Sequence, residues 1–280
     1  MHPPYDTVLR RRRLLGVAAA AAFAIRPALL RAQSLPAVDR PEGGFRFVPG
    51  NQVFATGAVA LPGFEIVHVM LDRWLELQDG YRFVEEFLRS AGRPMQSLCG
   101  MELRLPRQLS MDGFRAFNGP YVERLVSWGL LAEGRNPVSR TNVAPVFDPP
   151  EMPSLHAFSF ARAGRAARPT FVLSGMAENG PAGVVAAGDD SAAGFAAKTE
   201  FLVRAFRDRM QGLGVSFGDA THVDFYCAHP ERAPVTDVLM PALEFASRRG
   251  VRVHCARPPV EGLEVELEVR AFAAELVAGR

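Results

Sequence analysis

The chain has 280 residues, of which 48% are hydrophobic and 22% are charged, and its formal net charge is +2. This composition supplies a sizeable core and excludes a chain that is disordered throughout. The near balance of charge argues against a nucleic-acid partner, because nucleic-acid-binding proteins usually carry a basic excess. Three cysteines do not make a disulfide framework, and the sequence lacks CxxC, HExxH, P-loop and GxSxG motifs. It therefore gives no support for a metal site.

Residues 1–39 have the features of a targeting segment. Four arginines, Arg10–Arg13, precede the apolar segment 14–25, which is the order of regions in a twin-arginine signal peptide. The apolar run is shorter than the roughly 20 residues that cross a bilayer, so we expect no stable membrane span. This pattern favours export to the periplasm over a cytoplasmic location. The alternative is a disordered basic tail. In an exported chain, pairing of Cys227 with Cys255 is an open question.

The first half of the remaining chain predicts a strand at 51–57 and then a helix at 80–91. The helix is indicated by apolar residues that recur at i, i+3, i+4 and i+7, and Gly92 stands where a C-cap glycine belongs. The next predicted elements are a strand at 97–105, a helix at 114–131, a further strand, the pair Pro149–Pro150 and a closing strand at 155–160.

The second half repeats this order. It predicts strands at 169–175 and 220–228, helices at 191–213 and 235–249, a further strand, the pair Pro258–Pro259 and a closing strand at 264–269. In this closing strand charged and apolar residues alternate, which predicts one wet and one buried face. The segment 161–168 reads as a linker, so we expect one repeat over 40–165 and a second over 166–280. Each order is β-α-β-α-β-β, which predicts an α+β fold: a mostly antiparallel sheet with two helices on one face.

Residues 169–272 resemble the RidA (YjgF) family of reactive-intermediate deaminases, which has a chorismate-mutase-like fold. The features that carry the resemblance are Val172-Leu173-Ser174-Gly175, Lys198-Thr199-Glu200, and the segments 223–226 and 262–268. The first half resembles the same family through the segments 54–57, 114–121 and 137–143. The chain after residue 40 also resembles a two-repeat subgroup of 2-amino-5-chloromuconate deaminases, through the segments 136–143, 148–158 and 254–263.

The resemblance implies chemistry without a cofactor: hydrolysis of enamine or imine carboxylates to keto acids and ammonia. In the family a strand arginine binds the substrate carboxylate, since its planar fork pairs with two oxygens, and a glutamate on the following strand positions water. The resemblance also implies a homo-oligomer, and a trimer of two-repeat chains is one arrangement. The partner of such an enzyme is a small anionic substrate.

This sequence divides the arginine and the glutamate between its halves. When the repeats are aligned on their Pro-Pro pairs, Arg140 falls opposite Arg249, and Ala157 falls opposite Glu266. The first half keeps the arginine and the second keeps the glutamate, so we hypothesise that one class of site is built across a repeat or subunit interface. Arg252 is a rival carboxylate-binding residue, as is Arg257.

The candidate residues fall into two groups. The catalytic candidates are Arg140, Glu266, Arg257 and His254, and the substrate-binding candidates are Asn142, Asn118, Glu102, Arg104 and His156. Seven of these nine have a structural alternative. Arg140 is a surface arginine in that reading, Glu102 and Arg104 form an exposed ion pair, Asn118 and Asn142 support turns, His156 is a core histidine, and Glu266 lies on a solvated strand face.

Two function classes remain. The first is a cofactor-free hydrolytic deaminase of a 2-aminomuconate-like acid, whose two carboxylates need two cationic partners from Arg140, Arg104 and Arg257. The second is a non-catalytic RidA-fold protein that binds a small carboxylate or serves an assembly. Ala157 and the export pattern favour the second class. Ammonia release from 2-aminomuconate and 2-aminoacrylate separates the two.

Overall fold

The computed structural model of this protein describes residues 36–132 and 134–279. These residues belong to one compact unit. Residues 1–35 of the predicted twin-arginine segment, with all four arginines, lie outside the described residues, whereas Val38 and Asp39 at its end belong to a strand. In the part of the chain that the structure describes, no helix is long and apolar enough to cross a membrane.

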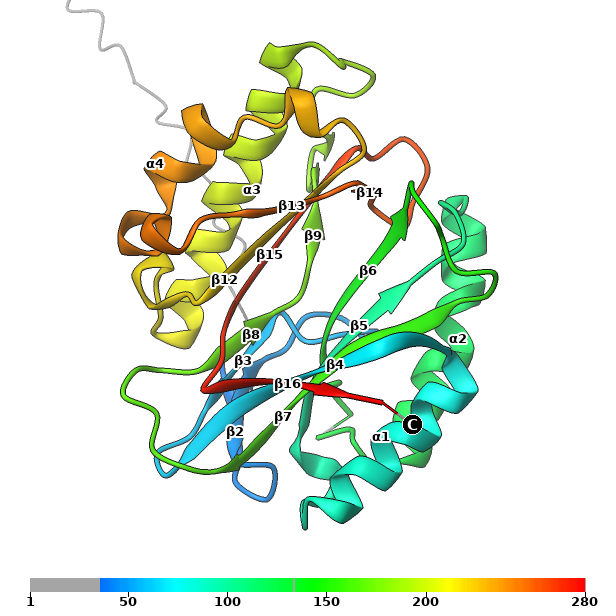
Figure 1. Cartoon of the computed structure of the whole chain (residues 1–280), viewed down its shortest axis with the longest axis vertical. Coiled ribbons are helices and arrows are strands. Elements are labelled where there is room, and N and C mark those ends of the chain that lie inside the picture. The colour runs from blue at the N-terminus through cyan, green and yellow to red at the C-terminus, as the bar shows by residue number, and fades with distance from the viewer. Residues whose placement is uncertain (1–35, 133, 280) are drawn as a thin grey trace, which may run out of the picture. The chain divides into compact units, whose positions relative to one another are not determined.

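Two mixed sheets form the centre of the fold (Figure 1). The first has six strands in the order β14 (Ala256–Arg257), β6 (Ser139–Pro145), β5 (Leu98–Arg104), β7 (Ser154–Ala163), β4 (Phe64–Glu76) and β16 (Ala274–Ala278). The second runs β1 (Val38–Arg40), β2 (Phe45–Val48), β3 (Gly57–Ala60), β8 (Phe171–Leu173), β15 (Val265–Ala271), β12 (His222–Cys227) and β13 (Arg252–His254), and β9 (Met176–Ala177) also pairs with β15. A separate hairpin joins β10 (Asn179–Gly180) to β11 (Gly183–Val184).

The central strands of the two sheets have the same order. The run β6-β5-β7-β4 in the first sheet matches β13-β12-β15-β8 in the second. In both runs the first pair is parallel and the pairs around the returning strand, β7 or β15, are antiparallel. This agreement confirms the predicted α+β class and the repeated topology. Each half also adds strands to the other half's sheet: β14 and β16 join the first, and β3 pairs with β8 in the second.

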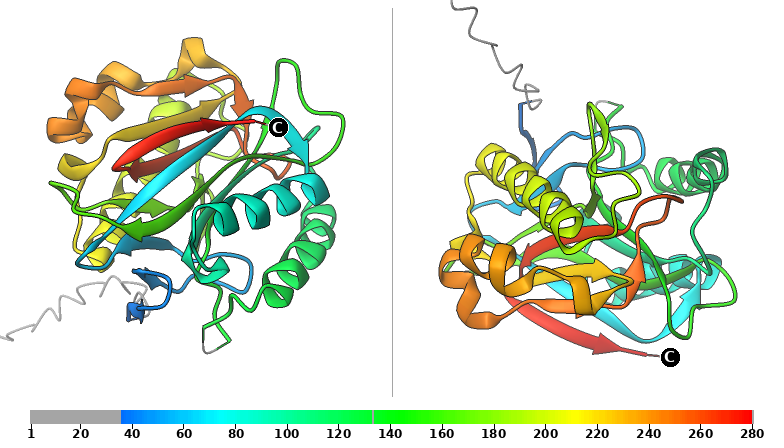
Figure 2. Two further views of the ribbon diagram at one scale, coloured as in Figure 1. Left: turned by 60° about the horizontal axis from the view of Figure 1, so that its bottom comes forward. Right: turned by 90° about the horizontal axis from the view of Figure 1, so that it is seen from above.

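Helices cover one face of each sheet (Figures 1 and 2). The helices α1 (Leu77–Ser90) and α2 (Met111–Ser127) pack on the first sheet, and α3 (Ala192–Leu213) packs on the second. The predicted helix at 235–249 is an irregular run of a π-helical turn (Val235–Leu239), α4 (Met240–Ala242) and a 3₁₀ segment (Glu244–Arg249). Pro241 explains the irregularity, because proline donates no backbone hydrogen bond and its ring clashes with the preceding turn. Gly214 ends α3 in the left-handed conformation, as expected for a C-cap glycine.

The observed strands differ from the expected ones in three parts of the chain. The segment 51–56 is a loop and not a strand, because the side-chain Oδ1 of Asn51 accepts hydrogen bonds from the backbone N–H groups of Val53 and Phe54 at 2.8 and 3.1 Å. The strand of the first half that matches β8 is β4, and neither β4 nor β16 was predicted. The expected linker at 161–168 begins as the end of β7.

The two sheets face each other through their helix-free surfaces. On β15, Val265, Leu267 and Val269 point to the helix side, whereas Glu266 and Glu268 point the other way, and every residue of the strand is buried. The prediction that this strand has a wet face is therefore wrong, because the first sheet covers the charged side. This charged interior holds the candidate site.

Candidate active site

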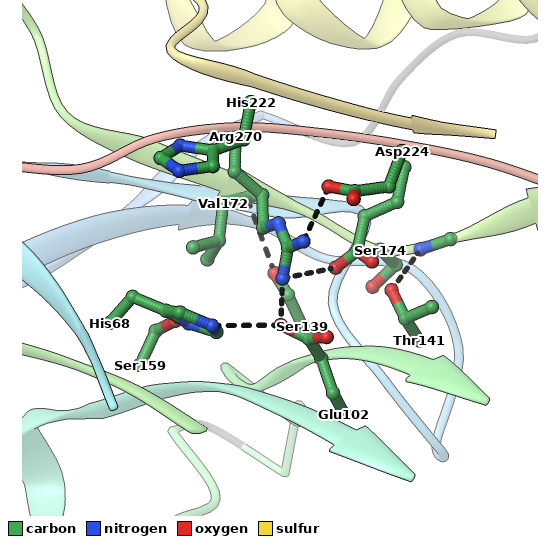
Figure 3. A network of polar contacts seen from close by, with 12 residues as sticks. His68, Glu102, Ser139, Thr141, Ser159, Val172, Ser174, His222, Asp224 and Arg270 are labelled. Atoms are coloured by element: carbon green, nitrogen blue, oxygen red, sulfur yellow. Dashed lines mark hydrogen bonds and ion pairs between the residues drawn. The ribbon is translucent and has the colours of Figure 1, made fainter. Parts of the chain in front are cut away.

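A buried ion network joins the two sheets at their centre (Figure 3). Arg270 of β15 forms ion pairs with Glu102 of β5 and, at 2.6 Å, with Asp224 of β12. Glu102 also lies 3.5 Å from Nε2 of His68 on β4 and 3.6 Å from Nη2 of Arg104. Burial in a low dielectric makes such charges costly unless they are paired, so this network fixes the two sheets against each other. Glu102 and Arg104 are both buried, which excludes the exposed ion pair considered above.

Arg140 extends from β6 toward α2. Its Nη1 donates to Oδ1 of Asn118 at 2.9 Å, and its guanidinium lies 4.8 Å from the ring of Tyr121 and 5.5 Å from the rings of Phe54 and Phe114. Burial lowers the pKa of Arg140 below its ordinary value, and the charge of Glu266 partly opposes that shift. The side chain is buried, so it is not the surface arginine of the structural alternative. The rings and Asn118 fix the orientation of the guanidinium, whose planar fork is suited to pairing with a planar anion.

The side chain of Asn142 lies on the same face of β6 as Arg140, two residues further along the strand. Among the described residues, neither its Nδ2 nor its Oδ1 has a hydrogen-bond partner, although Asn142 is only 4% exposed. The hydroxyl of Tyr121, which stacks on Arg140, is also buried without a described partner. Buried polar atoms are nearly always paired, so these atoms are candidates for contact with a polar group such as water or a ligand.

Glu266 approaches the backbone of Asn142 from the second sheet. Burial raises its pKa to about 8, while the positive charges of Arg104 and Arg140 and a backbone hydrogen bond from Asn142 oppose the rise. Burial also lowers the pKa of Arg209 of α3 to about 10, and the negative charge of Glu266 opposes that shift. The arginine of the first half and the glutamate of the second half therefore lie in one electrostatic neighbourhood, as the hypothesis of a shared site requires.

The loop after β8, in the second half, forms hydrogen bonds with β6 of the first half. The Oγ of Ser174 accepts from the backbone N–H of Arg140 at 2.9 Å, and the N–H of Gly175 donates to Oγ1 of Thr141 at 3.1 Å. A Cβ built on Gly175 overlaps Oε1 of Glu266 and lies 3.0 Å from Thr141. Gly175 is therefore the residue that allows the backbone to pass this close to the carboxylate.

Replacing Gly175 with alanine should displace the Glu266 carboxylate. Because a misplacement of about 1 Å costs on the order of 100-fold in rate, we expect kcat/KM to fall about 100-fold in Gly175→Ala. Gly183→Ala is the matched control, since nothing lies within 4 Å of its Cβ position, although its positive φ adds backbone strain. Steady-state kinetics with melting curves of both variants tests this. If kcat/KM of Gly175→Ala equals that of the wild-type chain, Glu266 has no part in the reaction.

A second cluster lies between the sheets, next to Glu266. The Arg104 guanidinium sits 5.6 Å from the ring of Tyr226, which stacks on His254 at 4.8 Å. The Tyr226 hydroxyl donates to Oε2 of Glu268 at 2.9 Å, and burial raises the pKa of Glu268 to about 8. His156 is half-buried, and its pKa is held well below the ordinary value by burial and by nearby positive charges, first that of Arg104.

The structure thus sorts the sequence candidates. It joins Arg140 to Asn118, places Glu266 beside Arg104 and Asn142, and gathers His156 and His254 near Arg104. Arg257, on β14, pairs with Glu264 at 3.6 Å. His254 lies 2.7 Å from Asp224. Arg249 is not equivalent to Arg140: it ends a 3₁₀ segment and donates to the carbonyl of Ala220. Sequence reasoning missed Asp224, Arg270, Glu268, Tyr226, Tyr121 and Arg209.

The model of the 2-aminomuconate deaminase CnbZ family matches residues 37–276. The chain belongs to this family. A 2-amino-5-chloromuconate deaminase from Comamonas testosteroni is 36% identical over 248 residues, which cover 84% of this chain and 96% of that protein. These findings confirm the predicted resemblance and the prediction of a deaminase.

Two crystal structures are similar at lower levels. A chorismatase is 14% identical, with a TM-score of 0.46, and the match covers 85% of this chain and 80% of that chain. Rv2704 of Mycobacterium tuberculosis, from the YjgF/YER057c/UK114 family, is 20% identical with a TM-score of 0.24, covering 40% of this chain and 83% of that chain.

The described residues contain no group of three or more His, Cys, Asp or Glu side chains placed to hold a metal ion. Cys99, Cys227 and Cys255 are free thiols in the structure.

Proposed function

We propose that the chain hydrolyses a 2-aminomuconate-like acid at a single site shared by its two repeats, 40–165 and 166–280. The observation that carries the proposal is that the charges of Arg140 and Glu266, one from each repeat, act on each other next to Asn142, whose backbone N–H bonds to Glu266 and whose unpaired side-chain amide lies on the Arg140 face of β6. The family to which the chain belongs supports a deaminase of this substrate class.

In the proposed reaction the enamine first tautomerises to the imine by gaining a proton at carbon and losing one from nitrogen. Water then adds to the imine carbon, and the carbon–nitrogen bond breaks to release ammonia and leave the keto acid. The chemistry needs orientation more than activation, because the imine is intrinsically reactive. Water is the only co-reactant.

Each residue at the junction has a proposed part. Arg140, held by Asn118 and the aromatic rings, binds the carboxylate next to the amino group in a bidentate manner. The Asn142 amide and the Tyr121 hydroxyl supply the donors and acceptors that lack described partners. Glu266 orients the water and accepts its proton, a role that suits a carboxyl with a pKa near the working pH.

The remote carboxylate of the substrate requires a second cation, and Arg104 is the best placed. It lies on the neighbouring strand to Arg140, opposite Val143 in the register, so its side chain turns toward Tyr226 of the second sheet whereas that of Arg140 turns toward α2. The charges of both arginines act on Glu266. We propose Arg257 as a further cation near the remote carboxylate, because its strand β14 pairs with β6 at Ala144.

Arg104→Gln should therefore discriminate between substrates of different length. We expect kcat/KM for 2-aminomuconate to fall about tenfold more than kcat/KM for 2-aminoacrylate, because only the first has a second carboxylate, and a buried charge-assisted hydrogen bond is worth about 1.5–3 kcal/mol. Comparing two substrates in one variant removes any general loss of folded protein. An equal loss for both substrates would contradict the assignment.

Ammonia release tests the proposed function itself. The wild-type chain should release ammonia from enzymatically generated 2-aminomuconate, and so should Arg82→Ala, which changes an exposed arginine of α1. No release from 2-aminomuconate or from 2-aminoacrylate, together with measurable carboxylate binding, would favour the non-catalytic alternative.

Export and a homo-oligomer stay predictions. Surface hydrophobic side chains support an interface: Phe147 is 84% exposed and Val277 on the edge strand β16 is 67% exposed. A trimer of two-repeat chains is the arrangement we propose.

A further inference from the structure

An irregularity in β4 brings Trp74 to the rim of the space between the sheets. The pairing of β4 with β7 shifts register between Met70 and Leu75, and Trp74 lies in that interval. Its side chain is 36% exposed, so Trp74 is not a core residue. Its Nε1–H donates to Nδ1 of His156 on β7 at 3.1 Å. Register shifts of this kind re-aim a side chain, often next to an active site.

This hydrogen bond determines the form of the His156 ring. The indole N–H is only a donor, so Nδ1 of His156 must be unprotonated to accept from it. The ring is neutral, because burial and the charges of Arg104, His254 and Arg252 hold its pKa well below the ordinary value. A neutral ring that accepts at Nδ1 carries its proton on Nε2. Trp74 therefore makes His156 an Nε2–H donor.

The surroundings of His156 favour an anion. Arg252 and His254 both contact the carboxylate of Asp224, at 2.8 and 2.7 Å, which offsets part of their charge. Arg104 has a longer ion pair, 3.6 Å to Glu102, which itself also binds Arg270. The side chains of Arg252 and His254 are 45% and 38% exposed, so this end of the space opens to solvent. Arg104 lies opposite Ser154 of β7, two residues before His156, and its charge is the first of those that act on the His156 ring. The Arg104 guanidinium and the Nε2–H of His156 are therefore two donors near this opening for one carboxylate.

We propose that Trp74 is a positioning residue that fixes His156 as an Nε2–H donor, and that His156 with Arg104 binds the carboxylate of the substrate remote from its amino group. The proposal rests on the proposed function in one respect, the dicarboxylate nature of the substrate. Selectivity for a dicarboxylate then depends on Trp74, which acts on the ligand only by orienting His156.

The test uses binding, so that it is independent of turnover. The probes are cis,cis-muconate, an unreactive dicarboxylate, and sorbate, a monocarboxylate with a similar carbon chain. In Trp74→Phe we expect the Kd of muconate to rise about five- to tenfold, the effect of misorienting one hydrogen-bond donor, and the ratio of the muconate Kd to the sorbate Kd to rise with it. Trp128→Phe is the matched control, because the Trp128 indole N–H bonds instead to Glu85 on the helical side.

Nitrogen-15 NMR of the histidine rings gives a second, structural readout. The wild-type chain should show His156 in the Nε2–H tautomer, and Trp74→Phe should show a mixture of tautomers. His156→Ala should lose the same dicarboxylate preference, and His156→Gln, which keeps a donor, should restore part of it. Combining Trp74→Phe with His156→Ala should add no further loss.

Two results would overturn the inference: an Nδ1–H tautomer of His156 in the wild-type chain, or an equal rise in Kd for muconate and sorbate in Trp74→Phe. Failure of the proposed function looks different, since it would appear as absent ammonia release with the muconate preference intact.

Discussion

Arg140→Ala should remove nearly all ammonia release from 2-aminomuconate. Removing one partner of a buried, hydrogen-bonded ionic contact costs about 2–5 kcal/mol, so we expect kcat/KM to fall on the order of 100- to 1000-fold. The loss follows from the geometry: the guanidinium is held by Asn118 and three rings, so solvent or a neighbouring side chain cannot readily replace it.

The lysine variant sharpens this test. Arg140→Lys keeps the charge but loses the planar fork, so it should recover only a small part of the activity. Binding of a carboxylate ligand should weaken in parallel, and melting curves should show that both variants are folded. Full deaminase activity in Arg140→Ala would show that the carboxylate binds elsewhere.

Glu266→Gln should have an effect of similar size, with a different signature. A general base contributes about 10²- to 10⁴-fold to rate, and glutamine cannot accept the proton. Because the pKa of Glu266 is raised to about 8, the wild-type kcat/KM should increase as the pH rises from 6 to 9. The residual activity of Glu266→Gln should lack this increase. A variant that keeps the wild-type pH profile would assign the titration to another group, of which Glu268 is the nearest candidate.

The same pKa has a consequence for stability. A carboxyl whose pKa is higher in the folded chain than in the unfolded chain favours folding while it is protonated. Its ionisation therefore lowers the free energy of unfolding as the pH rises from about 4.5 to about 8. The melting temperature of Glu266→Gln should fall less than that of the wild-type chain between pH 6 and pH 9. A steeper fall of the melting temperature in Glu266→Gln would contradict a raised pKa of Glu266 in the folded chain.

Sequence patterns predicted most of the framework. Helical periodicity located α1 and α3 within a few residues, and the Pro-Pro pairs located the returning strands β7 and β15. The missed β4 has a local cause. The repeat comparison favoured residues 51–57, but Asn51 turns the chain there, and the matching strand begins at Phe64.

The site could be predicted only in part. The split of Arg140 and Glu266 between the halves was visible in the sequence, as was the hypothesis of a shared site. The burial of Glu266 was not, because an alternating charged strand looks the same whether water or a second sheet covers it. Asp224 and Arg270 were missed for this reason. The bond from Trp74 to His156 depends on a register shift that no sequence pattern marks.

The central claim is that both repeats contribute residues to one binding site. Calorimetric titration of the chain with muconate tests this claim most directly. We predict one muconate bound per wild-type chain. We also predict affinities at least tenfold weaker both in Arg140→Ala, which changes the first half, and in Gly175→Ala, which changes the second. Two muconates per chain, or a variant of one half that keeps a full-affinity site, would contradict the account.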